Sequence, residues 1–422
     1  MEHSTITLII MIASAVFLLF EIIPPSITAI LCCLALTLTG ILTPTQAFAQ
    51  FSSPNIMLFA AMFVIGHAVF SSGLAGDIGA LIQRFADSEK KLVLAVLIVS
   101  GGLSAFLSNT STSAIFLPLI IGVAAGTGYN RGKLLYTMIV AVGMGGGTTF
   151  LGGPGWLFTK SAIENANPGT VVSMFELTKV GLPLLVISIV YMAVIGYKLI
   201  PVRDVPEEYV EAKQENKIVP IRKKQLTAVV TALTILCMLF ASQIKMNASV
   251  IAIIGAVILV LTNVVTETEA YRAISWKTLI LFGGLLPLST ALDKTGAGQM
   301  ISDSILSLMG NTTNPYVITA VCMTVPCILS QFLSNATCMA IFTPLGISIA
   351  KGIGADPTAV IMAISIGSGI AIATPIGQPG NAMIYGPSGL RFMDYVKPGL
   401  PLTVILLIAA SLMIPNVWPF FH

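Results

Sequence analysis

Residues 106–119 read FLSNTSTSAIFLPL, and residues 332–345 read FLSNATCMAIFTPL. The two stretches begin 226 positions apart, and each contains a Ser-Asn pair followed by an apolar run that ends at Pro-Leu. Self-similarity at a fixed offset indicates an internal repeat. The repeat divides the chain into two halves that we expect to share one fold.

Further matches extend the repeat over most of each half and follow the same order in both. Because the order is kept, chance similarity of one apolar stretch does not explain them. The matching pairs are Gly147-Thr148 with Ala373-Thr374 at the offset of 226, Phe59 with Phe282 and Gly73 with Gly296 at an offset of 223, and VGLPL at 180–184 with PGLPL at 398–402.

The composition is that of a membrane protein. Of 422 residues, 55% are hydrophobic and 9% are charged, against roughly a quarter charged in soluble domains. Stretches of about 17–25 apolar residues, the length that crosses a bilayer, recur throughout the chain. We therefore expect an all-α integral, multi-pass protein of the cell membrane, surrounded by lipid, and in a bacterium of the inner membrane. The apolar stretches are 5–23, 26–42, 55–71, 133–152, 173–200, 226–243, 248–264, 277–293, 358–376 and 399–418.

Each half contains a pair of apolar arms that are too short for two comfortable crossings. The arms of about 15 residues are joined at a polar Ser-Asn, which predicts a re-entrant hairpin. Five full crossings then remain per half, and an odd number inserts the second half upside down, as in inverted-repeat transporters. The expected arms are 92–107 with 111–125 and 316–331 with 338–350, and each hairpin follows an amphipathic stretch, at 74–88 and 297–310.

The positive charges test this topology independently. With ten crossings and two hairpins that do not cross, one side of the membrane receives 16 of the 21 Lys and Arg residues. Cytoplasmic segments carry the excess of such residues. The pattern predicts both termini outside, a cytoplasmic linker at 201–224, and hairpins that enter from opposite sides.

Non-helical backbone in a membrane survives only where it lines a cavity or is buried in protein. Each half offers two such places: the tips Ser108-Asn109-Thr110 and Ser334-Asn335-Ala336, and the helix breaks 143–155 and 373–381. Ser, Asn and Thr cap helix N-termini, whose free N–H groups attract anions. Unwound carbonyls attract cations. Tips and breaks are therefore the candidate transport sites.

None of the 18 Asp and Glu residues lies in a tip or a break. Proton-driven carriers use ionisable relays within the membrane, whereas sodium can be held by neutral oxygens, so sodium coupling fits better. The three histidines His3, His67 and His422 provide no nucleophile–base pair, which argues against an enzyme. No basic block contains interleaved aromatics, so we expect no nucleic-acid partner.

The tips SNTSTSAIFLP and SNATCMAIFTP, followed by ATPIGQPGN, resemble those of the divalent-anion:sodium symporter family within the ion transporter superfamily. The resemblance covers nearly the whole chain. It implies a homodimer, sodium as the coupling ion, no other cofactor, and a di- or tricarboxylate or sulfate as the small anionic substrate. It also implies a transport domain that moves like an elevator against a scaffold domain. The expected domains are scaffold 1–90 and 225–310, transport 91–200 with hairpin 91–125 and 311–422 with hairpin 316–350, and the linker 201–224.

Carried over by position, the resemblance implies two sodium sites and one anion site. The first sodium site would use Ser104, the Ser108 carbonyl, Asn109 and the Gly147 carbonyl, and the second Ser330, the Leu333 carbonyl, Asn335 and the Ala373 carbonyl. The anion would meet Ser108, Asn109, Thr110, Ser334, Asn335, Thr337, Thr374 and Pro375.

Two departures from the family pattern bear on which anion is carried. Ala336 stands where a Thr hydroxyl could bind a second carboxylate, although Thr337 follows. The first break reads TTFLGGPGW and not the TPIGxPxN-like string of the second.

Three other functions stay open at this point. One is an anion or metalloid permease, or a sodium/proton antiporter, of the same superfamily. Another is an anion channel, which concentrative, saturable uptake would exclude. The third, an intramembrane enzyme, lacks the paired catalytic groups that hydrolysis needs.

Overall fold

The computed structural model describes residues 2–19, 22–72, 87–203, 220–240, 244, 246–298, 300 and 314–421. All regular secondary structure in these ranges is helical, as the sequence predicted. Most of the amphipathic stretches expected at 74–88 and 297–310, and most of the linker 201–224, lie outside the described residues.

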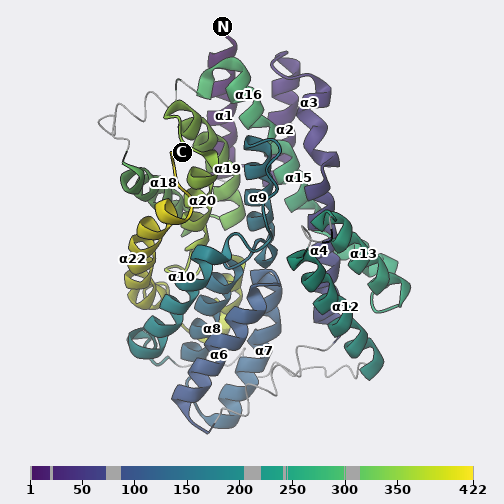
Figure 1. Cartoon of the computed structure of the whole chain (residues 1–422). Coiled ribbons are helices and arrows are strands. Elements are labelled where there is room, and N and C mark those ends of the chain that lie inside the picture. Colours follow the sequence, from purple (N-terminus) through teal and green to yellow (C-terminus); the bar gives the residue numbers. More distant parts are fainter. Residues whose placement is uncertain are drawn as a thin grey trace.

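The helices of the two halves follow one another in the same order (Figure 1). The first half contains α1 (His3–Leu19), α2 (Pro25–Leu38), α3 (Pro44–Phe48), α4 (Pro54–Ser71), α6 (Glu89–Ser104), α7 (Asn109–Thr127), α8 (Arg131–Gly146), α9 (Pro154–Ala166), α10 (Thr178–Tyr191) and α11 (Tyr197–Leu199). The second contains α12 (Ile221–Leu239), α13 (Ala248–Leu261), α14 (Glu267–Ala273), α15 (Trp276–Leu285), α16 (Pro287–Thr295), α18 (Pro315–Ser330), α19 (Asn335–Gly352), α20 (Pro357–Gly369), α21 (Pro379–Ser388) and α22 (Phe392–Val417).

Corresponding helices begin with the same kind of cap, which shows that the repeat is encoded locally. Thr43 and Thr266, 223 positions apart, each form a capping box with the residue three positions on. Asn130 and Asp356 cap α8 and α20 at an offset of 226. A side-chain oxygen at the N-cap satisfies an N–H that the helix itself leaves unpaired.

The two hairpins approach the middle of the molecule from opposite ends. Figure 1 shows α6 and α7 in its lower part and α18 and α19 in its upper part. The arms pack against the first segment of the broken helix that follows them, α8 in one half and α20 in the other. This opposed arrangement is the inverted repeat that the sequence predicted.

The expected length of the arms was wrong for α7. This helix runs for 19 residues and is, by length and composition, among the four described helices that could cross a membrane. Arm length alone would therefore have made it a full crossing. Its start at Asn109 contacts Gln378, which lies in the break of the second half, so the tip meets the opposite break inside the protein.

Both predicted helix breaks are present. The helix α8 ends at Gly146 and α9 begins at Pro154, while α20 ends at Gly369 and α21 begins at Pro379. Proline suits the first helical position because its missing N–H would be unpaired there in any case. Glycine lets the neighbouring backbones approach: a Cβ at Gly145 would lie 2.1 Å from the carbonyl oxygen of Gly101.

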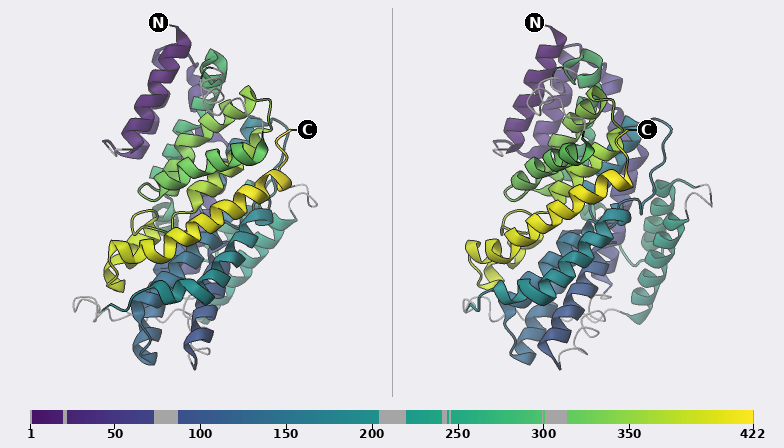
Figure 2. Two further views of the ribbon diagram at one scale, coloured as in Figure 1. Left: turned by 90° about the vertical axis from the view of Figure 1, so that its left-hand side faces the viewer. Right: turned by 60° about the vertical axis from the view of Figure 1, so that its left-hand side comes forward.

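The helices form two groups in which the halves are interleaved. In one group α2 packs against α15 and α4 against α13, and in the other α9 packs against α19 and α8 against α21. Figure 2 shows α22 running beside α10, which it contacts. The buried carboxylate of Asp394 at the start of α22 accepts two hydrogen bonds from Arg203, at 2.9 and 3.1 Å, and so ties the end of the first half to the second.

Candidate functional site

The two hairpin tips have the same local geometry. The side chain of Ser108 accepts a hydrogen bond from the Ser111 N–H at 3.2 Å, and Ser334 accepts one from the Thr337 N–H at 3.2 Å. Each serine is the N-cap of a long helix, so Asn109 and Asn335 occupy the first helical position. Both tips thus present helix N-termini, which carry partial positive charge.

At the first tip, three oxygens share too few protons. The Ser104 hydroxyl oxygen lies 3.0 Å from Asn109 Oδ1 and 2.8 Å from the carbonyl oxygen of Val142. A hydroxyl has one proton and can satisfy only one of these acceptors fully. Ser104 is completely buried. A cation at this point would satisfy all three oxygens.

Glycine at position 146 is required by the side chain of Asn109. A Cβ there would lie 2.0 Å from Asn109 Oδ1 and 3.2 Å from the carbonyl oxygen of Gly152. The amide oxygen of Asn109 and the carbonyl of Gly152 therefore meet on one face of the break.

At the second tip, the amide of Asn335 faces two carbonyl oxygens. One of its terminal atoms lies 3.1 Å from the oxygen of Ser368 and 3.2 Å from that of Gly377. If this atom is the nitrogen, it donates a hydrogen bond to each carbonyl. If it is the oxygen, three oxygens converge, and a cation is needed to stabilise them. The geometry is compatible with both states.

The carbonyls beside the two asparagines occupy equivalent positions in the repeat. Val142 and Ser368 lie 226 positions apart, as do Ser104 and Ser330. The Ser330 hydroxyl differs from that of Ser104 in one respect, since it donates to the Cys327 carbonyl of its own helix at 3.0 Å.

Within the break the offset between the two halves changes from 226 to 225. The pairing of Gly147-Thr148 with Ala373-Thr374, made at 226, is therefore replaced by the pairing of Thr148-Thr149 with Ala373-Thr374. Thr149 donates to the carbonyl of Ala105, and Thr374 donates in the same way to that of Gln331. These threonines are 225 positions apart. At this offset TTFLGGPG and ATPIGQPG share Thr, Gly, Pro and Gly, so the first break matches the second better than the sequence comparison suggested.

Three of the expected carbonyl ligands have other neighbours in the structure. The carbonyl oxygen of Gly147 points at Gly181 of α10, where a Cβ would lie only 2.1 Å from it. Leu333 and Ala373 are buried beside the second tip and break, but the carbonyls within hydrogen-bonding distance of Asn335 are those of Ser368 and Gly377. Gly152 and Gly377, whose carbonyls lie beside Gly146 and Asn335, are paired with each other at the offset of 225.

Several residues expected to meet the anion serve the internal structure of the tips and breaks. The hydroxyl of Thr337 is bonded to that of Ser334 at 2.7 Å. Thr374 accepts hydrogen bonds from the N–H groups of Ile376 and Gly377, at 3.4 and 3.1 Å, and the neighbouring Pro375 is buried. Thr110, in contrast, is exposed.

Replacing Thr149 or Thr374 by valine is expected to destabilise the protein. Each change keeps the side-chain shape but leaves a buried carbonyl and at least one N–H unpaired, at about 1–3 kcal/mol. Thermal unfolding in detergent should show a lower midpoint for both variants than for Thr262→Val. Thr262 is exposed and bonds only within its own helix, so an equal loss in all three variants would contradict the prediction.

A cleft lies between α4 and the first tip. Its cavity volume is about 40 Å³, and the hydroxyls of Ser108 and Ser111 line one side. The opposite wall consists of Phe59, Met62 and Phe63 of α4. None of its lining residues is charged. The second tip does not line this cleft, so the two tips do not share it.

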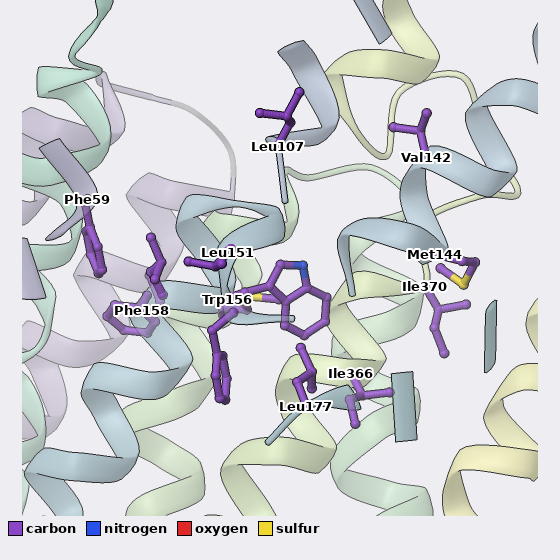
Figure 3. Close-up of a cluster of buried hydrophobic side chains, with 14 of the residues drawn as sticks. Phe59, Leu107, Val142, Met144, Leu151, Trp156, Phe158, Leu177, Ile366 and Ile370 are labelled. Carbon is purple, nitrogen blue, oxygen red and sulfur yellow. The ribbon is translucent and has the colours of Figure 1, made fainter. Parts of the chain in front are cut away.

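The breaks are supported by an apolar cluster that joins both halves. Figure 3 shows Trp156, at the start of α9, surrounded by labelled residues that include Leu151 and Met144 of the first half and Ile366 of the second. Trp156 is 5% exposed. A Cβ at Gly369 would lie 2.6 Å from its ring, so glycine at the end of α20 makes room for the indole.

Comparison with known proteins identifies this arrangement. The family model of the citrate transporters, CitMHS, matches residues 15–337 and 313–420. The chain belongs to the CitMHS citrate transporter family. As a family member it is a multi-pass membrane transporter, which agrees with the sequence-based arguments for a superfamily transporter and against an enzyme.

Two curated relatives match nearly the whole chain. One is a transporter of Haemophilus influenzae, 25% identical over 96% of this chain and 90% of its own length. Another is the sodium-dependent dicarboxylate transporter SdcS of Staphylococcus aureus, 24% identical over 94% of this chain and 83% of its own length.

The fold of this citrate transporter family member also resembles a solved structure. The YdaH transporter of Alcanivorax borkumensis, described as having an unusual topology, superposes with a TM-score of 0.66 over 90% of this chain and 87% of its own. The sequence identity is 16%, so the likeness concerns the fold alone.

Proposed function

We propose that the protein is a sodium-coupled symporter that imports small carboxylates, namely di- or tricarboxylates. The observation that carries the proposal is that neutral oxygens lie beside each tip: those of Ser104, Asn109 and Val142 in one half, and in the other the carbonyls of Ser368 and Gly377, which the Asn335 amide faces. Sodium is a hard cation that such oxygens can hold without a carboxylate. The family's description and the sodium-dependent dicarboxylate relative support this choice.

We assign the anion to the cleft beside the first tip, which has to widen from its volume of about 40 Å³ to admit a carboxylate. There the N-terminus of α7 and the hydroxyls of Ser108 and Ser111 offer hydrogen-bond donors. Because no charged side chain lines the cleft, sodium bound nearby supplies positive charge for the anion. Sodium and anion should consequently raise each other's affinity by the same factor.

Uptake into proteoliposomes tests this function. With an inward sodium gradient, labelled succinate or citrate should accumulate several-fold above its external concentration, and uptake should saturate. With choline replacing sodium at fixed pH, accumulation should disappear. Equal uptake in choline would exclude sodium coupling, uptake of sulfate alone would exclude the carboxylate assignment, and unsaturable uptake without accumulation would indicate a channel.

We further propose that transport moves the hairpins and broken helices against the first three crossings of each half. The moving group carries both oxygen clusters, whereas α4 meets it with an apolar face. On the other side of the molecule, α16 touches α19, and Lys351 forms an ion pair with Asp293 across this boundary. Such contacts between the groups must slide or break in each cycle.

Bridging this boundary is expected to stop transport. Asp293→Cys and Lys351→Cys, in a background without the six native cysteines, would be joined by a short bis-methanethiosulfonate reagent. Uptake should fall by about 90% or more, and a reductant should restore it, because the link holds α16 and α19 together. Either single cysteine variant, treated identically, is the control. Full transport in the bridged protein would contradict a moving hairpin group.

A further inference from the structure

Gln378 is a buried side chain that reaches from the break of one half to the tip of the other. Its Oε1 accepts a hydrogen bond from Asn109 Nδ2 at 3.0 Å, and its Nε2 donates to the carbonyl of Ala371 at 3.3 Å. The residue is 1% exposed. It packs on α8 at Gly143, where a Cβ would lie 2.6 Å from Nε2.

These contacts determine which way the Asn109 amide faces. Because its nitrogen donates to Gln378, its oxygen is turned toward Ser104 and Gly146. Rotating the Asn109 amide by 180° would set two acceptor oxygens 3.0 Å apart. Rotating the Gln378 amide would set its oxygen against that of Ala371. Both orientations are thus fixed by a chain of hydrogen bonds that starts at a backbone carbonyl.

The second tip has no equivalent of Gln378. At the offset of 225, the counterpart of Gln378 is Gly153, which has no side chain. Without a cation, the amide of Asn335 satisfies its hydrogen-bonding capacity by donating from its nitrogen to the carbonyls of Ser368 and Gly377. To hold sodium it must turn its oxygen toward them and give up both hydrogen bonds.

We infer that Gln378 makes the two cation sites unequal: it preforms the first, while the second forms only when the Asn335 amide rotates. Sodium therefore fills the site at Asn109 at a lower concentration than the site at Asn335. The inference rests on the proposed sodium coupling, and it names a positioning residue that acts through Asn109.

Sodium binding to the purified full-length protein in detergent tests the inference. Trp156 contacts Gly147 and Gly369 at the two breaks, so its fluorescence reports on both. Trp276→Phe and Trp418→Phe leave it as the single tryptophan, and potassium keeps the ionic strength constant. Titration with sodium should give two phases. Asn335→Ala should keep the tighter phase, and Asn109→Ala should remove it.

The decisive comparison is between two replacements of Gln378. Gln378→Leu removes the acceptor and should weaken the tighter phase about 3–10-fold, the worth of one hydrogen bond. Gln378→Glu keeps an acceptor for Asn109 Nδ2, and when it is protonated at its other oxygen it also keeps a donor for the Ala371 carbonyl. It should therefore bind sodium about as tightly as the parent. A residue that served packing alone would tolerate the apolar leucine better than the buried carboxyl group.

Gln331→Leu is the matched control, because it removes a buried amide of the same size. This amide bonds only within its own half, for example to the Ile370 carbonyl and the Ala373 N–H. It should leave the tighter phase unchanged. The inference fails if Gln378→Leu binds sodium like the parent, if Gln378→Glu weakens binding as much as leucine does, or if Asn335→Ala removes the tighter phase. Absence of any sodium-specific signal in the parent protein would instead refute the sodium coupling itself.

Discussion

Gly146→Ala is expected to reduce sodium-driven uptake strongly while the protein still inserts and folds. The added Cβ would lie 2.0 Å from Asn109 Oδ1, far inside van der Waals contact, and 3.2 Å from the carbonyl oxygen of Gly152. Asn109 would have to leave the position in which its oxygen meets Ser104. Overpacking of this kind costs about 1–3 kcal/mol. If this cost destabilises the sodium-bound state, the affinity for sodium decreases by roughly 5–150-fold.

Gly122→Ala is the matched control for this variant. Gly122 lies in the middle of α7, the same hairpin, and a Cβ there meets nothing within 4 Å. Its uptake should equal that of the parent protein. Sodium dependence should be measured from initial rates in proteoliposomes, with thermal unfolding as a check of folding. Parental sodium affinity in Gly146→Ala would mean that Asn109 does not bind the coupling ion.

Asn109→Ala and Asn335→Ala should each remove sodium-driven accumulation. Each change deletes a side-chain oxygen that no other residue of its tip replaces, and neutral ligands of this kind contribute about as much as hydrogen bonds to charged groups, roughly 1.5–3 kcal/mol. The sodium concentration for half-maximal uptake should therefore rise about 10–100-fold. Asn416→Ala is the control, since Asn416 is exposed and bonds to the Leu412 carbonyl of its own helix and to the Tyr316 hydroxyl, and to neither tip.

The two asparagine variants are distinguished from misfolded protein by a second measurement. In potassium both should still show a cooperative unfolding transition. Asn109→Ala should lose most of the upward shift that sodium produces, and Asn335→Ala only part of it, because a ligand stabilises only the state that binds it. A sodium-induced shift as large as that of the parent in both variants would exclude the two tips as cation sites.

Much of the fold could be predicted from the sequence because its signals are local. The duplicated Ser-Asn stretches predicted the two tips, and the caps Ser108 and Ser334 act through N–H groups only three residues away. The helix breaks follow from Gly and Pro, which act on their own backbone. The inverted arrangement followed from counting crossings and from the positions of Lys and Arg.

The candidate site was predicted less completely, because the oxygens beside the two asparagines are backbone carbonyls at the ends of α8 and α20 and in the breaks that follow them. The sequence indicated Ser104, Asn109 and Asn335, whose side chains lie at the tips, but not the carbonyls of Val142, Gly152, Ser368 and Gly377. Which way a carbonyl points in a helix break depends on what packs against it, as Gly147 shows by pointing at Gly181.

By itself the sequence determined the all-helical membrane fold, the two halves, the tips and the absence of acidic residues from them. Only the tertiary structure decided the one-residue shift between the breaks, the orientation of the Asn109 amide and the role of Gln378. The physical reason is distance along the chain: Gln378 and Asn109 are 269 residues apart and meet only because the two halves are packed in opposite directions.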